Sequence, residues 1–135
     1  MKLAVAVAVC APAWSALLVG SALAMTFDPI EFALDRVQVH TQHAIRYGEG
    51  PRWQDGRVGD CTTFAVHNHR AVKALGLPAD IWIVRDEKDE IHAVVVSGKD
   101  VLDSRFKHLK RRKALVRLGY EFMFRVKALP DGTRL

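Results

Sequence analysis

Gly59-Asp60-Cys61-Thr62-Thr63-Phe64-Ala65 is the stretch of sequence that decides the predicted fold. Asp60 is a favourable N-cap and Gly76 a favourable terminator, so we predict a helix over residues 61–75. Cys61 then lies in the first turn of that helix, where unpaired backbone N–H groups converge and the helix dipole lowers the pKa of a thiol. A thiol in this position is suited to nucleophilic attack, and the N–H groups are suited to stabilising an oxyanion.

After this helix the pattern changes to short apolar stretches that are typical of β-strands. We predict strands over residues 81–85, 91–97, 101–105 and 120–126, with a charged turn at 86–90. Gly98-Lys99 suits a two-residue hairpin turn, which pairs Ser97 with Asp100 and Val96 with Val101.

The hairpin register brings two polar residues to one face of the sheet. Because side chains alternate along a strand, His92 and Asp103 become diagonal neighbours with backbone positions roughly 7–8 Å apart. An imidazole and a carboxylate can close that gap with a hydrogen bond, which would fix the histidine tautomer and hold the ring toward the thiol. We therefore predict Cys61 as nucleophile, His92 as its base and Asp103 as the group that orients the histidine.

Before Cys61 the sequence predicts one more helix and a loop. Asp28 can cap a helix that has Pro29 at its first position, and apolar residues recur at helical spacing over 29–46. Residues 47–59 carry glycines, a proline and Trp53 without a sustained period, so we predict a loop in which Trp53 is a core or cleft-wall aromatic. The predicted fold is α+β, with both helices against a mostly antiparallel sheet.

Four motifs in this order carry a resemblance to a known family. They are residues 59–65 above, Gly76-Leu77-Pro78-Ala79, His92-Ala93-Val94 and Val101-Leu102-Asp103-Ser104-Arg105. Together they resemble the bacterial transglutaminase-like cysteine proteinases, a family that includes periplasmic proteases that release surface adhesins. The resemblance covers roughly residues 45–126. It implies a papain-like core, in which the helix bearing the cysteine packs on an antiparallel sheet, and a triad that falls on Cys61, His92 and Asp103.

The sequence departs from this family immediately after the cysteine. Family members commonly have acidic residues there, and in the adhesin-releasing branch acidic side chains near that point bind calcium. Thr62 and Thr63 stand there in this chain, and hydroxyls are poor substitutes for carboxylates around a hard cation. We therefore expect no calcium and no other cofactor.

A zinc site is also disfavoured. His40 and His43 can share a helix face, but His67 and His69 are two residues apart and diverge on a helix. We interpret these four histidines as surface residues.

The first 24 of the 135 residues predict a signal peptide. Lys2 precedes an apolar run that ends in small residues, and we expect cleavage after Ala24. Pro12 interrupts the run, which disfavours the alternative of a membrane anchor. We therefore predict a periplasmic or secreted protein with a single domain over residues 25–135, in which Cys61 is the only cysteine because Cys10 is removed.

The chain carries a formal net charge of +5, and its basic residues concentrate between positions 105 and 117. These are Arg105, Lys107, Lys110, Arg111, Arg112, Lys113 and Arg117. Such a segment favours an anionic partner, and export disfavours genomic nucleic acid.

Two functions therefore stay open. The first is a hydrolase that cleaves a peptide amide through a thioester, with transglutaminase activity if an amine takes the place of water. The second is a non-catalytic domain that binds an anionic cell-envelope partner through its basic segment.

Overall fold

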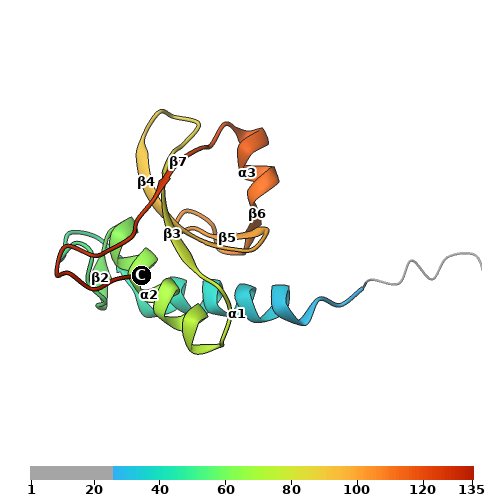
Figure 1. Cartoon of the computed structure of the whole chain (residues 1–135), viewed down its shortest axis with the longest axis horizontal. Coiled ribbons are helices and arrows are strands. Elements are labelled where there is room, and N and C mark those ends of the chain that lie inside the picture. Colours follow the sequence, from blue (N-terminus) through green and yellow to red (C-terminus); the bar gives the residue numbers. More distant parts are fainter. Residues whose placement is uncertain (1–25) are drawn as a thin grey trace, which may run out of the picture.

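Helices α1 and α2 pack side by side on one face of a five-stranded sheet, and α3 lies on the other face (Figure 1). The computed structural model describes residues 26–135, so the predicted signal peptide, residues 1–24, lies outside the described residues. In chain order the elements are α1 (Pro29–Ala44), β1 (Arg46–Tyr47), β2 (Val58–Gly59), α2 (Cys61–Ala74), β3 (Asp80–Arg85), β4 (Ile91–Ser97), β5 (Asp100–Leu102), β6 (Lys110–Arg111), α3 (Arg112–Leu118) and β7 (Glu121–Arg125).

The starts of α1 and α2 follow from their capping residues. Asp28 accepts hydrogen bonds from the N–H groups of Ile30 and Glu31 at 3.0 and 3.2 Å, and Asp60 accepts one from Thr62 at 2.9 Å. Both helices begin where the sequence predicts. Helix α1 ends two residues earlier than predicted, since the backbone becomes extended at Ile45 and then pairs as β1 with β2.

The strand order in the sheet is β6-β5-β4-β3-β7, and all neighbours are antiparallel. The predicted hairpin register is confirmed, because Ser97 pairs with Asp100 and Val96 with Val101. The predicted strand over 101–105 is wrong in extent. Strand β5 ends at Leu102, and the chain then turns so that Phe106 donates a backbone hydrogen bond of 3.1 Å to the carbonyl of Asp103.

Two apolar cores lie on opposite faces of the sheet. One joins α1 and α2 to the sheet through residues such as Leu34, Val72 and Val95. The other lies under α3, where Leu115 and Tyr120 pack against Val94. The basic residues between positions 105 and 117 lie in the turn after β5, in β6 and in α3.

The structure confirms the predicted α+β fold, with the helix that bears Cys61 packed on an antiparallel sheet. Within residues 26–135, no helix has both the length and the apolar character needed to cross a membrane.

Candidate active site

Cys61 is the first residue of α2 and is half-buried against the core between the helices and the sheet. Gly59 allows the chain to reach this point, because a Cβ atom there would lie 2.0 Å from the hydroxyl oxygen of Thr63. Asp60 accepts a hydrogen bond from the N–H of Thr62 at 2.9 Å, so this donor is already paired. The N–H of Cys61, at the first helical position, has no acceptor within the helix.

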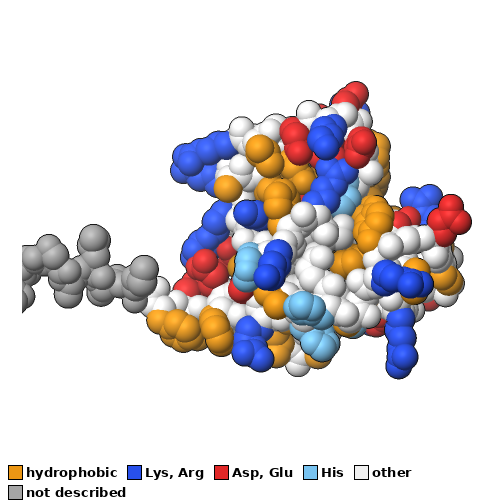
Figure 2. Space-filling model, turned by 180° about the vertical axis from the view of Figure 1, so that it is seen from behind, with side chains coloured by type: hydrophobic (Ala, Val, Ile, Leu, Met, Phe, Trp, Pro, Cys, Tyr) orange, Lys and Arg blue, Asp and Glu red, His pale blue; other side chains and the backbone are white. Residues whose placement is uncertain are grey.

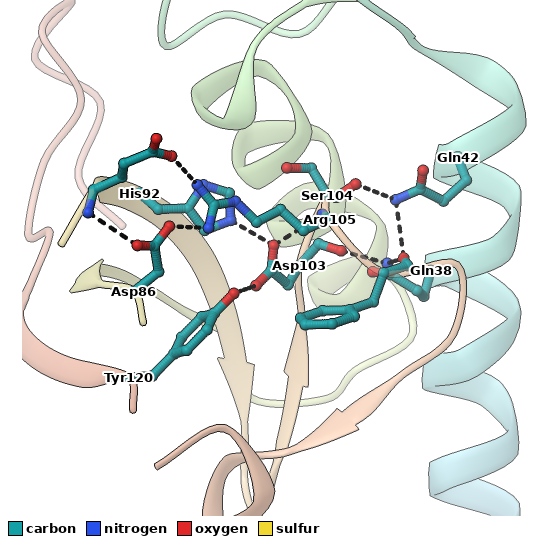
Figure 3. Close-up of polar contacts among 10 residues, drawn as sticks. Gln38, Gln42, Asp86, His92, Asp103, Ser104, Arg105 and Tyr120 are labelled. Atoms are coloured by element: carbon teal, nitrogen blue, oxygen red, sulfur yellow. Dashed lines mark hydrogen bonds and ion pairs between the residues drawn. The ribbon is translucent and has the colours of Figure 1, made fainter. Parts of the chain in front are cut away.

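His92 and Asp103 form the hydrogen bond that the hairpin register predicts. The ring atom Nε2 of His92 contacts Oδ1 of Asp103, and both side chains are buried (Figure 3). Asp103 reaches the imidazole from the turn after β5, since the β4–β5 ladder stops at the pair of Val95 and Leu102. The hydrogen bond occupies Nε2, so the Nδ1 atom of His92 is free to interact with the thiol.

Asp103 has two further hydrogen-bond donors. The backbone N–H of Arg105 donates to Oδ1 at 3.0 Å, and the hydroxyl of Tyr120 donates to Oδ2 at 3.0 Å. The sequence predicted Tyr120 only as a strand residue. A tyrosine that is buried usually needs a partner for its hydroxyl, which is the signal that could have pointed to this contact.

Two glutamines of α1 hold the turn that carries Asp103 (Figure 3). Gln38 donates from Nε2 to the carbonyl oxygens of Asp103, at 2.7 Å, and of Phe106. Gln42 donates from Nε2 to the carbonyls of Ser104 and Phe106, at 2.9 and 3.1 Å. Sequence reasoning missed both glutamines. A fully buried glutamine on the apolar face of a helix is the signal, because such a side chain requires polar partners.

Arg105 fixes the same turn from the opposite side. Its guanidinium contacts the buried carboxylate of Asp86 and lies 2.8 Å from Glu90. Asp86 also accepts hydrogen bonds from the N–H groups of Lys88 and Glu90, at 2.8 and 2.9 Å. Arg105, the first residue of the basic segment, therefore stabilises the fold next to the candidate site.

Other cations of the basic segment also have intramolecular partners. Arg111 lies close to Glu31 and 3.4 Å from Asp100. Arg112 lies over the rings of Trp82 and Phe122, at 5.0 and 4.4 Å from their centroids.

The electrostatics favour an ion pair of Cys61 and His92. Burial alone would raise the pKa of the Cys61 thiol, but its interactions with His92 and with the backbone of Ala93 hold that pKa below the ordinary value of 9.0. Burial would lower the pKa of His92, but the hydrogen bond to Asp103 and the interaction with Cys61 raise it to about 9. The two pKa shifts are in the directions that favour a thiolate beside an imidazolium.

Cys61 and His92 border one cavity of 460 Å³. The cavity lies between the start of α2 and strands β4, β3 and β7, on the face of the sheet that α1 and α2 cover. Trp53, Ile83 and Phe124 line it, and residues 128–130 form its far wall. The prediction of Trp53 as a core or cleft-wall aromatic is confirmed, since it packs on the core and faces this cavity.

Comparison with known proteins identifies the fold. No protein-family model matches the sequence, and no curated protein matches it. Calcium-bound LapG of Legionella pneumophila superposes with a TM-score of 0.61 at 19% identity, covering 76% of this chain and 68% of that chain. The fold is transglutaminase-like. A second structure of LapG gives a TM-score of 0.61 over 78% of this chain and 71% of that one, also at 19% identity. EGTA-treated LapG superposes with a TM-score of 0.58 at 19% identity, covering 76% of this chain and 67% of that chain.

The residues around Cys61 do not fit a calcium site. The hydroxyl of Thr62 donates to Asp60 at 2.6 Å and accepts from the N–H of Trp53 at 2.9 Å. The hydroxyl of Thr63 donates to the carbonyl of Pro51 at 3.1 Å. These hydrogen bonds tie the 47–59 loop to α2 directly.

The histidines outside the site do not form a metal cluster either. His67 contacts Asp55 at 2.8 Å, and its ring stacks with His40 at 6.4 Å between centroids. Among residues 26–135, no group of three or more His, Cys, Asp or Glu side chains is arranged to hold a metal ion.

Proposed function

We propose that this protein is a cysteine peptidase in which Cys61, His92 and Asp103 hydrolyse a peptide amide bond. The observation that carries the proposal is the buried hydrogen bond of His92 to Asp103 beside the cavity that His92 shares with Cys61. A histidine that is oriented by a carboxylate and lies next to a thiol at a helix start is the arrangement that nucleophilic catalysis needs.

The proposed reaction has two steps. The thiolate of Cys61 attacks the amide carbon, and the N–H of Cys61 stabilises the oxyanion that forms. The imidazolium of His92 gives its proton to the leaving amine, the C–N bond breaks and a thioester remains. His92 then takes a proton from water, whose oxygen attacks the thioester. The C–S bond breaks and releases the carboxylic acid and the Cys61 thiolate, which restores the ion pair with His92. An amine in place of water would give a transglutaminase reaction.

The likeness in fold supports peptidase chemistry over other reactions of an activated thiol. LapG is a transglutaminase-like cysteine protease. We also propose that the protein is periplasmic or secreted after cleavage behind Ala24, which rests on the N-terminal sequence alone.

The experiment measures alkylation of Cys61 by iodoacetamide at pH 6, with the labelled residue located by peptide mapping. A thiolate paired with His92 should react at least tenfold faster than free cysteine, and His92→Ala should remove the excess. His43→Ala is the matched control, because this histidine is exposed on α1. A rate no higher than that of free cysteine, unchanged in His92→Ala, would refute the proposal.

A second candidate function is supported by a groove beside α3. Its volume is 760 Å³, and its cationic lining consists of Lys99, Arg111, Arg112, Lys113 and Arg117. We propose this groove as the contact for an anionic cell-envelope partner. In Figure 2, Lys and Arg side chains are spread over the visible face, with acidic side chains beside several of them.

Vesicles that contain anionic phospholipid provide the probe for this second function. Lys113→Glu combined with Arg117→Glu should abolish binding, whereas Cys61→Ser should leave it intact. The control is the double variant Lys88→Glu with Lys127→Glu, which changes the net charge by the same amount at exposed positions outside the groove and should still bind. If both double variants bind equally well, the groove is not the contact.

A further inference from the structure

We propose that the substrate presents an apolar side chain next to the scissile amide, and that this side chain fills the cavity between Trp53 and the row Ala93, Ile83, Phe124. This inference rests on the proposed function and names its substrate class. The contact is made by residues that have no part in the bond-breaking steps.

The row follows from the register of the sheet. Ile83 pairs with Ala93 on one side and with Phe124 on the other, so the three side chains lie across β4, β3 and β7. All three line the cavity that Cys61 and His92 border. The row therefore forms an apolar floor that leads from the thiol toward β7, one of the two edge strands of the sheet.

Large apolar side chains at this cavity are left exposed. Phe124 is 54% exposed and Ile91 is 58% exposed, although both line the cavity. Covering these two side chains with an apolar group removes further apolar surface from water, which favours binding. An ammonium group in the same place would lose water without gaining a carboxylate partner. A carboxylate would have to compete with Asp60 for Arg52, which borders the cavity and already pairs with Asp60.

The charges around the cavity agree with this selectivity. Among residues 26–135, the ionisable residues that line it are Arg52, Cys61 and His92. The guanidinium of Arg52 is exposed and lies 3.3 Å from the carboxylate of Asp60. No carboxylate of the part of the chain that the structure describes lines the cavity to bind a basic substrate side chain.

Trp53 is held in place by an unusual backbone. Its φ angle is +60°, a left-handed conformation that is unfavourable for a bulky residue. The N–H of Trp53 donates to the hydroxyl of Thr62, which follows Cys61. Strain at such a position is typical of functional sites, and here it fixes the indole against the cavity.

The experiment compares chloroacetamides that differ only in the group on the amide nitrogen: methyl, isobutyl, benzyl or carboxymethyl. Each rate of Cys61 alkylation is divided by the rate with free cysteine. The isobutyl and benzyl reagents should react at least tenfold faster than the methyl reagent, because each apolar group added in an apolar pocket increases the rate by about tenfold or more. The carboxymethyl reagent should react no faster than the methyl reagent.

Phe124→Ser should remove most of this preference, because the floor of the cavity then loses its exposed apolar ring. Phe32→Ser is the matched control, because Phe32 is 51% exposed on α1 and lines no part of this cavity. Equal rates with all four reagents, or equal losses in the two variants, would overturn the inference. Fast alkylation without any preference would still leave the proposed function standing, whereas alkylation no faster than that of free cysteine would remove both.

Discussion

The hydroxyl of Tyr120 donates a hydrogen bond of 3.0 Å to Oδ2 of Asp103, the carboxylate whose other oxygen contacts His92. Both residues are buried. Burial and the nearby charge of Asp103 raise the pKa of Tyr120, so the hydroxyl keeps its proton and remains a donor. The carboxylate is therefore oriented from two sides.

Tyr120→Phe keeps the ring and removes only this donor. Because a buried carboxylate oxygen then loses a partner, the free energy of unfolding should fall by about 1–3 kcal/mol, as measured by urea denaturation. Tyr47→Phe is the control at an exposed position and should change it by less than about 0.5 kcal/mol. Equal effects of the two substitutions would show that the Tyr120 hydroxyl contributes nothing.

The imidazole of His92 should titrate near pH 9 in an NMR experiment, because Asp103 and Cys61 raise its pKa to about 9. Cys61→Ser should lower the midpoint, since the thiol contributes to the shift. A midpoint near 6.5 in both proteins would contradict the ion pair.

The same pKa values predict a bell-shaped pH dependence of peptide hydrolysis. Activity should fall on the acid side as Cys61 becomes protonated, at a pH below the ordinary thiol value of 9.0. It should fall on the alkaline side near pH 9, as His92 loses the proton that the leaving amine needs. A raised pKa also means that the folded protein binds this proton more tightly. Its contribution to stability is complete below pH 6.5 and is lost as the pH rises through about 9.

Gln38→Met keeps the length of the side chain and removes both hydrogen bonds to the turn at 103–106. We expect the free energy of unfolding to fall by about 1–3 kcal/mol, because buried carbonyls lose their donor. Alkylation of Cys61 at pH 6 should also slow, since Asp103 is held less firmly. Gln54→Met, at an exposed position, should change neither quantity. If Gln38→Met lowers the free energy of unfolding but leaves the rate of Cys61 alkylation unchanged, Gln38 does not position Asp103.

Removing calcium should leave this protein unchanged. The hydroxyls of Thr62 and Thr63 already hold the loop before Cys61. A chelator should therefore change neither the melting temperature nor the rate of Cys61 alkylation. A ligand that binds the folded state raises the melting temperature, so an increase on adding calcium would contradict this prediction.

Local signals were enough to predict the starts of both major helices and the hairpin. Asp28 and Asp60 cap their helices in the structure, and Gly98 adopts a φ angle of +58° in the turn. These features depend on neighbouring residues only, so sequence reasoning reaches them.

The surroundings of Asp103 depend on distant residues and could not be predicted in the same way. The predicted strand over 101–105 failed because Gln38, Gln42 and Arg105 favour a turn there. Nothing in the local sequence links Gln38 to a turn 65 residues later. The predicted hydrogen bond of His92 to Asp103 is present, although it is made from that turn rather than from a paired strand.

The distances along the chain between Asp103 and its partners bear on how the site matures. Gln38 precedes Asp103 by 65 residues, and Tyr120 follows it by 17. Synthesis proceeds from the N-terminus, so Cys61 and His92 leave the ribosome before the residue that completes the carboxylate's hydrogen bonds. We therefore expect the thiol of Cys61 to reach its full reactivity only after Tyr120 and the strand that follows it have been synthesised.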